Sequence, residues 1–153
     1  MIAVYKCEWG YIRIQYEHDV LLSLTYTEQE VVPAEGESSS FAEQVFAELV
    51  EYLGGKRKTF DIKYKLIGTK FQLAVWRELL KIPYGETRSY KEIAQALGNA
   101  QAARAVGNAN NKNPLQIIVP CHRVIGADGD LKGYAAGVGI KAKLLKLERQ
   151  GQD

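Results

Sequence analysis

The sequence predicts an α+β protein in which a small N-terminal α/β domain, residues 1–66, precedes a mostly helical C-terminal domain, residues 67–153. Three observations predict this division. β-forming residues dominate the first 25 positions, whereas three Ser/Thr-x-x-Glu/Gln capping boxes mark helix starts further along the chain. The charge also changes sign: residues 1–66 hold 7 Lys and Arg against 11 Asp and Glu, and residues 67–153 hold 13 against 7.

An antiparallel sheet is predicted at the N-terminus. Residues 2–7, 10–16 and 20–25 are rich in Val, Ile, Leu and Tyr, and such runs between short polar turns are typical of strands. The turn Glu17-His18-Asp19 would return the chain as a hairpin. Apolar residues at positions 60, 62 and 64, with Asp and Lys between them, predict a final strand.

One helix is predicted within this first domain. A loop over residues 32–40, which contains Pro, Gly and Ser, leads into the capping box Ser40-Phe41-Ala42-Glu43, where the helix would begin. Gly54-Gly55 would end it. Apolar side chains recur at helical spacing between these limits and predict one buried face. They are Phe41, Val45, Phe46, Leu49 and Leu53.

Helical signals dominate the second domain. Capping boxes begin at Thr69 and Ser89, and Pro83 and Gly98 would end the two helices that follow. A short turn after Gly98 leads to a further helix, which is the pattern of a helix-turn-helix. The predicted elements are helices over 69–82, 89–97 and 101–110, a buried strand over 115–119 and a last helix over about 140–150. The predicted core positions are Phe71, Val75, Trp76, Leu79, Leu80, Ile93, Ala94, Leu97, Ile140, Leu144 and Leu147.

Composition excludes several classes of protein. No apolar run reaches the roughly 18 residues of a membrane helix, and the N-terminus lacks the apolar core of a signal peptide. Cys7 and His18 are too few for a closed zinc site, so we expect no metal and no cofactor. With only two cysteines and a candidate reactive thiol, we expect a reducing compartment: the cytoplasm, or the nucleus in a eukaryote.

The candidate nucleophile lies in Pro120-Cys121-His122-Arg123-Val124, directly after the apolar run 115–119. A thiol attacks as the thiolate, and an ordinary Cys with a pKa of about 8.5 is only slightly ionised near neutral pH. His122 is the nearest base that could change this. An isolated buried Cys is usually inert packing, but a Cys-His-Arg triplet is costly to bury without a purpose.

The segment 101–109 predicts contact with DNA. It holds a single charge, Arg104, among small residues, whereas a reader of the major groove would carry several long polar side chains. A smooth helix with one arginine fits a narrow groove, with Arg104 entering the base stack and the small residues lying against the backbone. Ordinary core packing remains the alternative for some of the alanines. The basic balance of this half agrees with nucleic-acid binding.

Four segments together resemble a known family, the 6-O-alkylguanine-DNA alkyltransferases, which are methylated-DNA–protein-cysteine methyltransferases. The similar segments cover roughly residues 67–150 in order and spacing, while the first half resembles the family only in layout. These segments are Ile82 to Tyr90, Ala102 to Gly107, Asn113-Pro114, and Ile118 to Ile125.

The resemblance implies a role for each matching residue. Cys121 would accept the alkyl group, His122 would take its proton through a water, and Glu148 would hold His122. Tyr90 would protonate the leaving guanine, and Arg104 would fill the gap of the flipped nucleotide. The implied catalytic residues are Cys121, His122, Glu148, Tyr90 and Asn113, the last as a brace of the loop; the implied substrate-binding residues are Val124, Ala135 and Lys141; the implied DNA-binding residues are Tyr90, Lys91, Asn99, Ala102, Ala103 and Arg104.

The sequence departs from the family at Ala135-Ala136, where the family often has a hydroxyl residue or glycine followed by glycine or a larger residue. Acceptance of bulky adducts is therefore open. The expected partner is double-stranded DNA containing alkylated guanine. We expect the protein to be a monomer and not to bind a membrane.

Three other functions compete with alkyl transfer. A non-catalytic lesion sensor of the alkyltransferase-like kind usually lacks the cysteine. A helix-turn-helix regulator with a structural Cys would bind undamaged DNA in a sequence-specific way. A cysteine hydrolase needs a direct Cys–His pair, and adjacent residues of a strand point to opposite faces.

Overall fold

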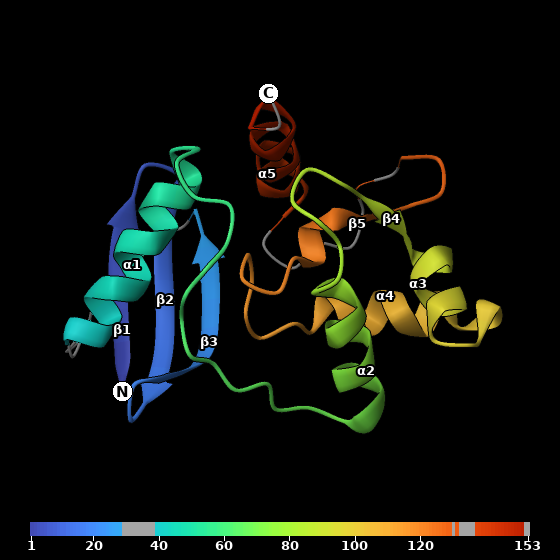
Figure 1. The fold of residues 1–153 in the computed structure, drawn as a ribbon, viewed down its shortest axis with the longest axis horizontal. Helices are drawn as coiled ribbons and strands as arrows, with labels where there is room; N and C mark the ends of the chain where they lie inside the picture. Colours follow the sequence, from blue (N-terminus) through green and yellow to red (C-terminus); the bar gives the residue numbers. More distant parts are fainter. Residues whose placement is uncertain (29–38, 130, 132–136, 152–153) are drawn as a thin grey trace. The chain divides into compact units, whose positions relative to one another are not determined.

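The computed structural model describes residues 1–28, 39–129, 131 and 137–151, which form two compact units, Met1–Leu66 and Ile67–Asp153 (Figure 1). The first unit contains an antiparallel sheet and one helix, and the second consists mainly of helices. The predicted α+β class is therefore confirmed. The separate roles expected for the two units are predictions that the fold alone does not test.

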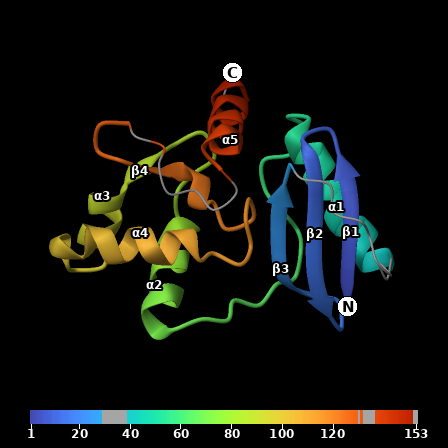
Figure 2. The same ribbon diagram turned by 180° about the vertical axis from the view of Figure 1, so that it is seen from behind.

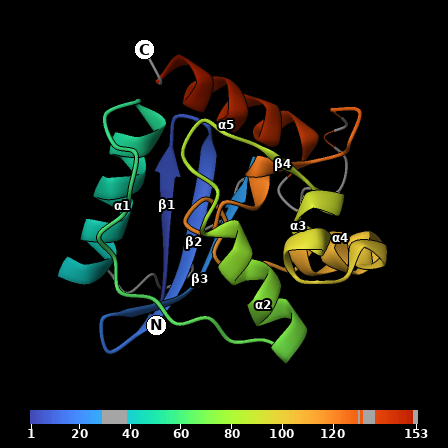
Figure 3. The same ribbon diagram turned by 45° about the vertical axis from the view of Figure 1, so that its right-hand side comes forward.

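The N-terminal unit is a three-stranded sheet with one helix packed on it. β1 (Ile2–Cys7), β2 (Gly10–Glu17) and β3 (Val20–Thr27) pair antiparallel in the order β1-β2-β3, so the three predicted strands are confirmed. The helix α1 (Ser40–Leu53) contacts β1 (Figure 3). The rings of Tyr5 and Phe46 stack with their centroids 4.5 Å apart. Aromatic stacking of this kind adds to the burial of apolar surface.

Two predictions for this unit are wrong in detail. The N-cap of α1 is Ser39 rather than Ser40, because the Ser39 hydroxyl accepts the hydrogen bond from the Ala42 amide at 3.1 Å. The expected final strand over 60–64 is absent from the described residues, where only a single bridge joins Tyr64 to Leu21. Gly54 ends α1 as expected. Most of the expected loop over 32–40 lies outside the described residues.

The C-terminal unit places its helices around two very short strands (Figure 2). β4 and β5 pair parallel, which joins Arg88 to Val124 and Ser89 to Ile125. α4 contacts both α2 and α3. The elements are α2 (Lys70–Leu79), β4 (Arg88–Ser89), α3 (Tyr90–Ala96), the 3₁₀ turn η1 (Ala100–Ala102), α4 (Ala103–Asn111), the 3₁₀ turn η2 (Cys121–Arg123), β5 (Val124–Ile125) and α5 (Val138–Gln150).

Both capping boxes predicted in this unit are present. Thr69 and Ser89 each accept the amide of the residue three positions on, and the side chains of Gln72 and Glu92 accept the cap amides in return. α3 and α4 are separated by a turn in which Gly98 has a φ of +84°, a conformation that favours glycine. The helix expected from residue 101 starts as a 3₁₀ turn and becomes α-helical at Ala103.

The end and the buried face of α2 differ from the prediction. The helix ends at Leu79 instead of Ile82. The amides of Lys81 and Ile82 donate to carbonyls three residues earlier in the chain, which is the 3₁₀ pattern, and Pro83 follows. Phe71 and Leu80 are 39% and 38% exposed, so they are not core residues of this unit. On α5, likewise, Leu145 is buried while Leu147 is only half-buried.

The prediction of a strand over 115–119 is wrong, although the predicted burial of the segment is confirmed. Within the segment, Leu115 forms a single bridge and residues 116–118 form turns, and Ile117 has a φ of +73° that no strand residue adopts. The side chain of Asn113 replaces the ladder of a sheet: Nδ2 donates to the carbonyls of Leu115 and Val119 at 3.2 and 2.8 Å, and Oδ1 accepts the Leu115 amide at 3.0 Å. Asn113 thereby braces the loop that ends at Cys121.

Candidate active site

Cys121 opens the 3₁₀ turn η2 rather than ending a strand. Its amide donates to the carbonyl of Val119 at 2.7 Å, and its own carbonyl accepts the amide of Val124. The residue is 2% exposed. Because Cys121 and His122 lie in a 3₁₀ turn and not in a strand, their side chains are not required to point to opposite faces.

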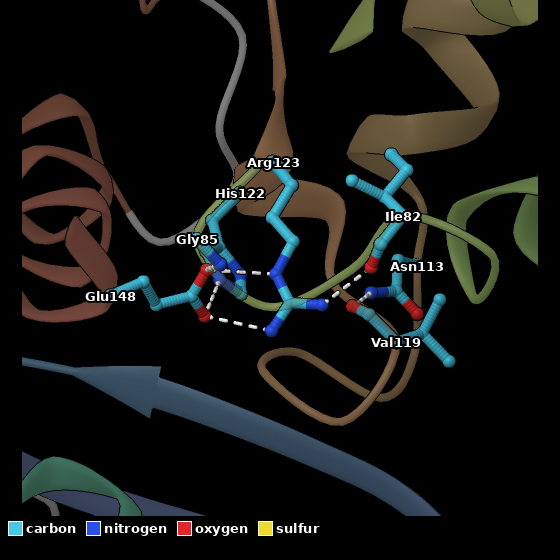
Figure 4. A network of polar contacts seen from close by, with 7 residues as sticks. All are labelled: Ile82, Gly85, Asn113, Val119, His122, Arg123 and Glu148. Atoms are coloured by element: carbon cyan, nitrogen blue, oxygen red, sulfur yellow. Dashed lines mark hydrogen bonds and ion pairs between the residues drawn. The ribbon is translucent and has the colours of Figure 1, made fainter. Parts of the chain in front are cut away.

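Figure 4 shows a buried polar cluster that contains His122, the residue directly after Cys121 in the chain. One oxygen of Glu148 accepts from His122 Nε2 at 2.7 Å and from Arg123 Nη2 at 2.9 Å. The other accepts from Arg123 Nε at 2.8 Å and from the amide of Gly85 at 3.3 Å. Arg123 Nη1 donates to the carbonyl of Ile82 at 2.8 Å. The carboxylate is therefore held by four donors, and one arginine grips it in the two-bond geometry that planar guanidinium favours.

The cluster favours a neutral His122. Burial lowers the pKa of His122 from its ordinary 6.5, and the charges of Arg123 and Lys141 act in the same direction, while Glu148 opposes them. A neutral imidazole carries one proton, and an ionised Glu148 can only accept, so Nε2 holds the proton. Nδ1 is then the ring nitrogen with a lone pair that can receive a proton from a thiol.

Lys141 is a second buried cation of the site. Its ammonium is fully buried, donates to the carbonyl of Val124 at 2.5 Å and lies 5.9 Å from the centre of the Tyr90 ring. Three residues expected to line the substrate and catalytic site, Val124, Lys141 and Tyr90, are thus brought together. Ala135 and Ala136 lie outside the described residues.

The predicted DNA-contacting residues lie on α3, η1 and α4. Arg104, Lys91 and Asn99 are exposed, while Ala102 and Ala103 are half-buried beside them. The Asn99 side chain caps η1 by accepting the amide of Gln101 at 3.1 Å. α4 hence presents one long cation at its exposed start, on a helix whose other side, with Val106 and Ala109, is core.

Comparison with known proteins decides the family. The family profile described as "6-O-methylguanine DNA methyltransferase, DNA binding domain" matches residues 70–150. The chain belongs to this methyltransferase family. A relative named methylated-DNA–protein-cysteine methyltransferase, from Methanosarcina acetivorans, is 56% identical over 112 residues, which span 73% of this chain and 72% of the relative. One of the same name from Mycobacterium leprae is 51% identical over 134 residues, 85% of this chain and 81% of the relative.

Solved structures extend the similarity to the whole methyltransferase chain. The crystal structure of Mycobacterium tuberculosis OGT in complex with DNA superposes with a TM-score of 0.89 at 43% identity, covering 98% of this chain and 93% of that one. The similarity therefore includes the N-terminal unit, for which the motifs predicted only a similar layout. The family resemblance drawn from the four segments is confirmed.

Arg123 is the methyltransferase residue that sequence reasoning left without a role. It lies inside the Pro-Cys-His-Arg-Val segment, and a buried arginine requires an acidic partner. That requirement was the available signal, because the resemblance already implied a buried role for the carboxylate of Glu148. Among the described residues, no group of three or more His, Cys, Asp or Glu side chains could hold a metal ion. Within the same ranges, no helix has the length and apolar content to cross a membrane.

Acidification is expected to destabilise this methyltransferase through His122. Because the pKa of His122 is lowered by folding, the unfolded chain binds a proton below about pH 6.5 that the folded chain does not. The free energy of unfolding should then fall with decreasing pH, by up to about 1.4 kcal/mol per pH unit. Urea unfolding between about pH 5 and pH 7 measures this slope.

The variant His122→Asn should lose this component of the slope. His18→Asn is the matched control, since it removes an exposed imidazole from the turn between β2 and β3. Identical slopes in wild type and His122→Asn would mean that His122 binds protons equally in both states.

Proposed function

We propose that this chain repairs double-stranded DNA by moving the alkyl group of 6-O-alkylguanine onto Cys121. The observation that carries the proposal is the buried cluster in which Glu148 of α5 binds His122 and Arg123, the two residues directly after Cys121. The chain's other cysteine, Cys7, ends strand β1 in the N-terminal unit. The names of the relatives support transfer to a cysteine as the activity.

The proposed reaction is a displacement at carbon. His122 takes the thiol proton at Nδ1 through a bridging water, and the sulfur of Cys121 forms a bond to the alkyl carbon while the bond from that carbon to the guanine oxygen breaks. Glu148 holds the Nε2 proton of His122 and stabilises the imidazolium that forms. Guanine gains one proton and Cys121 loses one, so the net reaction exchanges an alkyl group for a proton.

Tyr90 and Arg104 serve the nucleotide. The 6-O-alkyl carbon is inaccessible inside a duplex, so the base must leave the stack, which costs a few kcal/mol and less for a badly paired lesion. Arg104, at the exposed start of α4, fills the gap. Tyr90 gives a proton or hydrogen bond to a ring nitrogen of the departing guanine, and the Lys141 ammonium near its ring favours the negative charge that develops on the phenol oxygen.

The thioether product has no easy return path, so each chain acts once and uses no cofactor. A thiol that must stay reduced favours a reducing compartment, and we infer the cytoplasm. Val124 and Lys141, joined by the hydrogen bond from the lysine ammonium to the Val124 carbonyl, line the guanine pocket.

One alkyl group per chain is the expected stoichiometry. Incubation with excess duplex containing 6-O-methylguanine should add the mass of one methyl group to the intact protein, located on Cys121 by peptide mapping. Cys7→Ala should react like wild type, whereas Cys121→Ala should bind the duplex without gaining mass. Continued removal of methyl groups by pure protein, beyond one per chain, would contradict a thioether end product.

A further inference from the structure

Asn110 is a buried polar residue to which neither the sequence motifs nor the proposed mechanism assigns a role. It lies in the last turn of α4, is 1% exposed, and its Nδ2 donates to the carbonyl of Cys121 at 3.3 Å. The same carbonyl accepts the amide of Val124, which closes the turn η2. The two lone pairs of the Cys121 carbonyl are thus used by one donor from its own turn and one donor from α4.

The chemistry of the amide argues against simple packing. Asn110 Oδ1 is buried and accepts no hydrogen bond from the described residues. A buried, half-satisfied amide is costly, and a leucine of similar volume would avoid that cost. The orientation with Nδ2 toward Cys121 follows because a carbonyl can only accept. What the amide contributes at this position is therefore its bond to the backbone of the candidate nucleophile.

The turn that carries Asn110 is also held by a side chain of α2. Trp76 of α2 donates its indole Nε1 to the carbonyl of Ala109 at 2.9 Å, within the buried core. Asn113 binds the loop before Cys121 through Leu115 and Val119 and does not bond to Cys121 itself in the described contacts. Asn110 is thus a side-chain link that runs from α4 directly to the backbone of Cys121.

We propose that Asn110 is a positioning residue through which α4, the helix that faces DNA, sets the backbone of Cys121 for transfer. This inference rests on the proposed role of Cys121 as the acceptor. Arg104 and Asn110 lie six residues apart, about 9 Å along the helix, with the first exposed and the second against Cys121. A shift of α4 when Arg104 enters the base stack therefore changes the hydrogen bond to the Cys121 carbonyl.

Two variants test the link through transfer rates. Asn110→Leu keeps the volume and removes the donor, and Asn110→Asp keeps the shape and places an acceptor against the carbonyl. Each should lower the single-turnover rate constant at saturating methylated duplex by about tenfold or more, with the affinity for unmodified duplex within about twofold of wild type. Asn108→Leu and Asn108→Asp are the matched controls, because Asn108 is exposed on the same helix; they should keep the rate constant.

A second measurement uses the wild-type protein, so its result does not depend on whether the Asn110 variants fold. The chain has two cysteines, so carbonyl-¹³C cysteine labelling gives two resonances, with Cys7 as the internal reference. Saturating unmodified duplex should move the Cys121 carbonyl resonance more than that of Cys7. An unmoved Cys121 resonance, or wild-type transfer rates in both Asn110 variants, would overturn the link. Absence of transfer by wild type would instead overturn the proposed function.

Discussion

Glu148→Gln is expected to slow alkyl transfer by about 10²–10³-fold and to lower the free energy of unfolding by about 3–5 kcal/mol. The carboxylate accepts four hydrogen bonds, from His122, twice from Arg123 and from Gly85, and all of them are buried or half-buried. A glutamine offers one acceptor oxygen and turns its amino group toward a donor. Arg123 would then be a buried cation without its anion, and His122 would lose the group that fixes its tautomer.

Three measurements separate these effects. Urea unfolding gives the stability, single-turnover kinetics at saturating methylated duplex gives the rate, and titration of unmodified duplex gives an affinity that should change little. The matched control is Glu86→Gln, which removes an exposed partner of Arg88 at 3.3 Å and should cost less than about 1 kcal/mol. A wild-type transfer rate in Glu148→Gln, and likewise in His122→Ala, would remove both residues from the mechanism.

Arg104→Ala is expected to slow transfer on duplex DNA by about 10- to 100-fold while leaving the reaction with free 6-O-alkylguanine within about twofold. The side chain is exposed at the start of α4 and is the only charged one on that helix. It should replace the extruded base, whose unstacking costs a few kcal/mol. Arg104→Lys should restore the rate only in part, because an ammonium lacks the flat guanidinium that can stack in the vacated position.

Lys91→Ala is the matched control for the loss of one positive charge. Lys91 is exposed on α3, and its expected partner is a phosphate. This variant should weaken duplex binding and reduce its salt dependence by about one counterion, with the duplex rate at saturation preserved. Equal losses on duplex and free base in Arg104→Ala would show that Arg104 supports the fold or the pocket, and the assignment to nucleotide flipping would be abandoned.

Local signals predicted much of the fold. The capping boxes at Thr69 and Ser89 can be predicted from the sequence, because the two residues of each box lie three positions apart. The same reasoning missed the cap of α1 by one position, since the serine run 38–40 offers three possible caps and only the folded chain selects Ser39. The apolar run 115–119 was correctly predicted as buried, but apolar content alone does not distinguish a strand from turns.

For the candidate site, the sequence by itself determined the chemical groups and their local order: the thiol and imidazole of Cys121 and His122, and the carboxylate of Glu148 within the predicted last helix. Only the tertiary structure decided their partners. Arg123 reaches Glu148 across 25 positions and the Ile82 carbonyl across 41, and Asn110 reaches Cys121 from a helix end. The physical reason is range: caps and helical faces depend on neighbours three or four residues away, whereas a buried charge finds its partner only when distant segments pack together and exclude water.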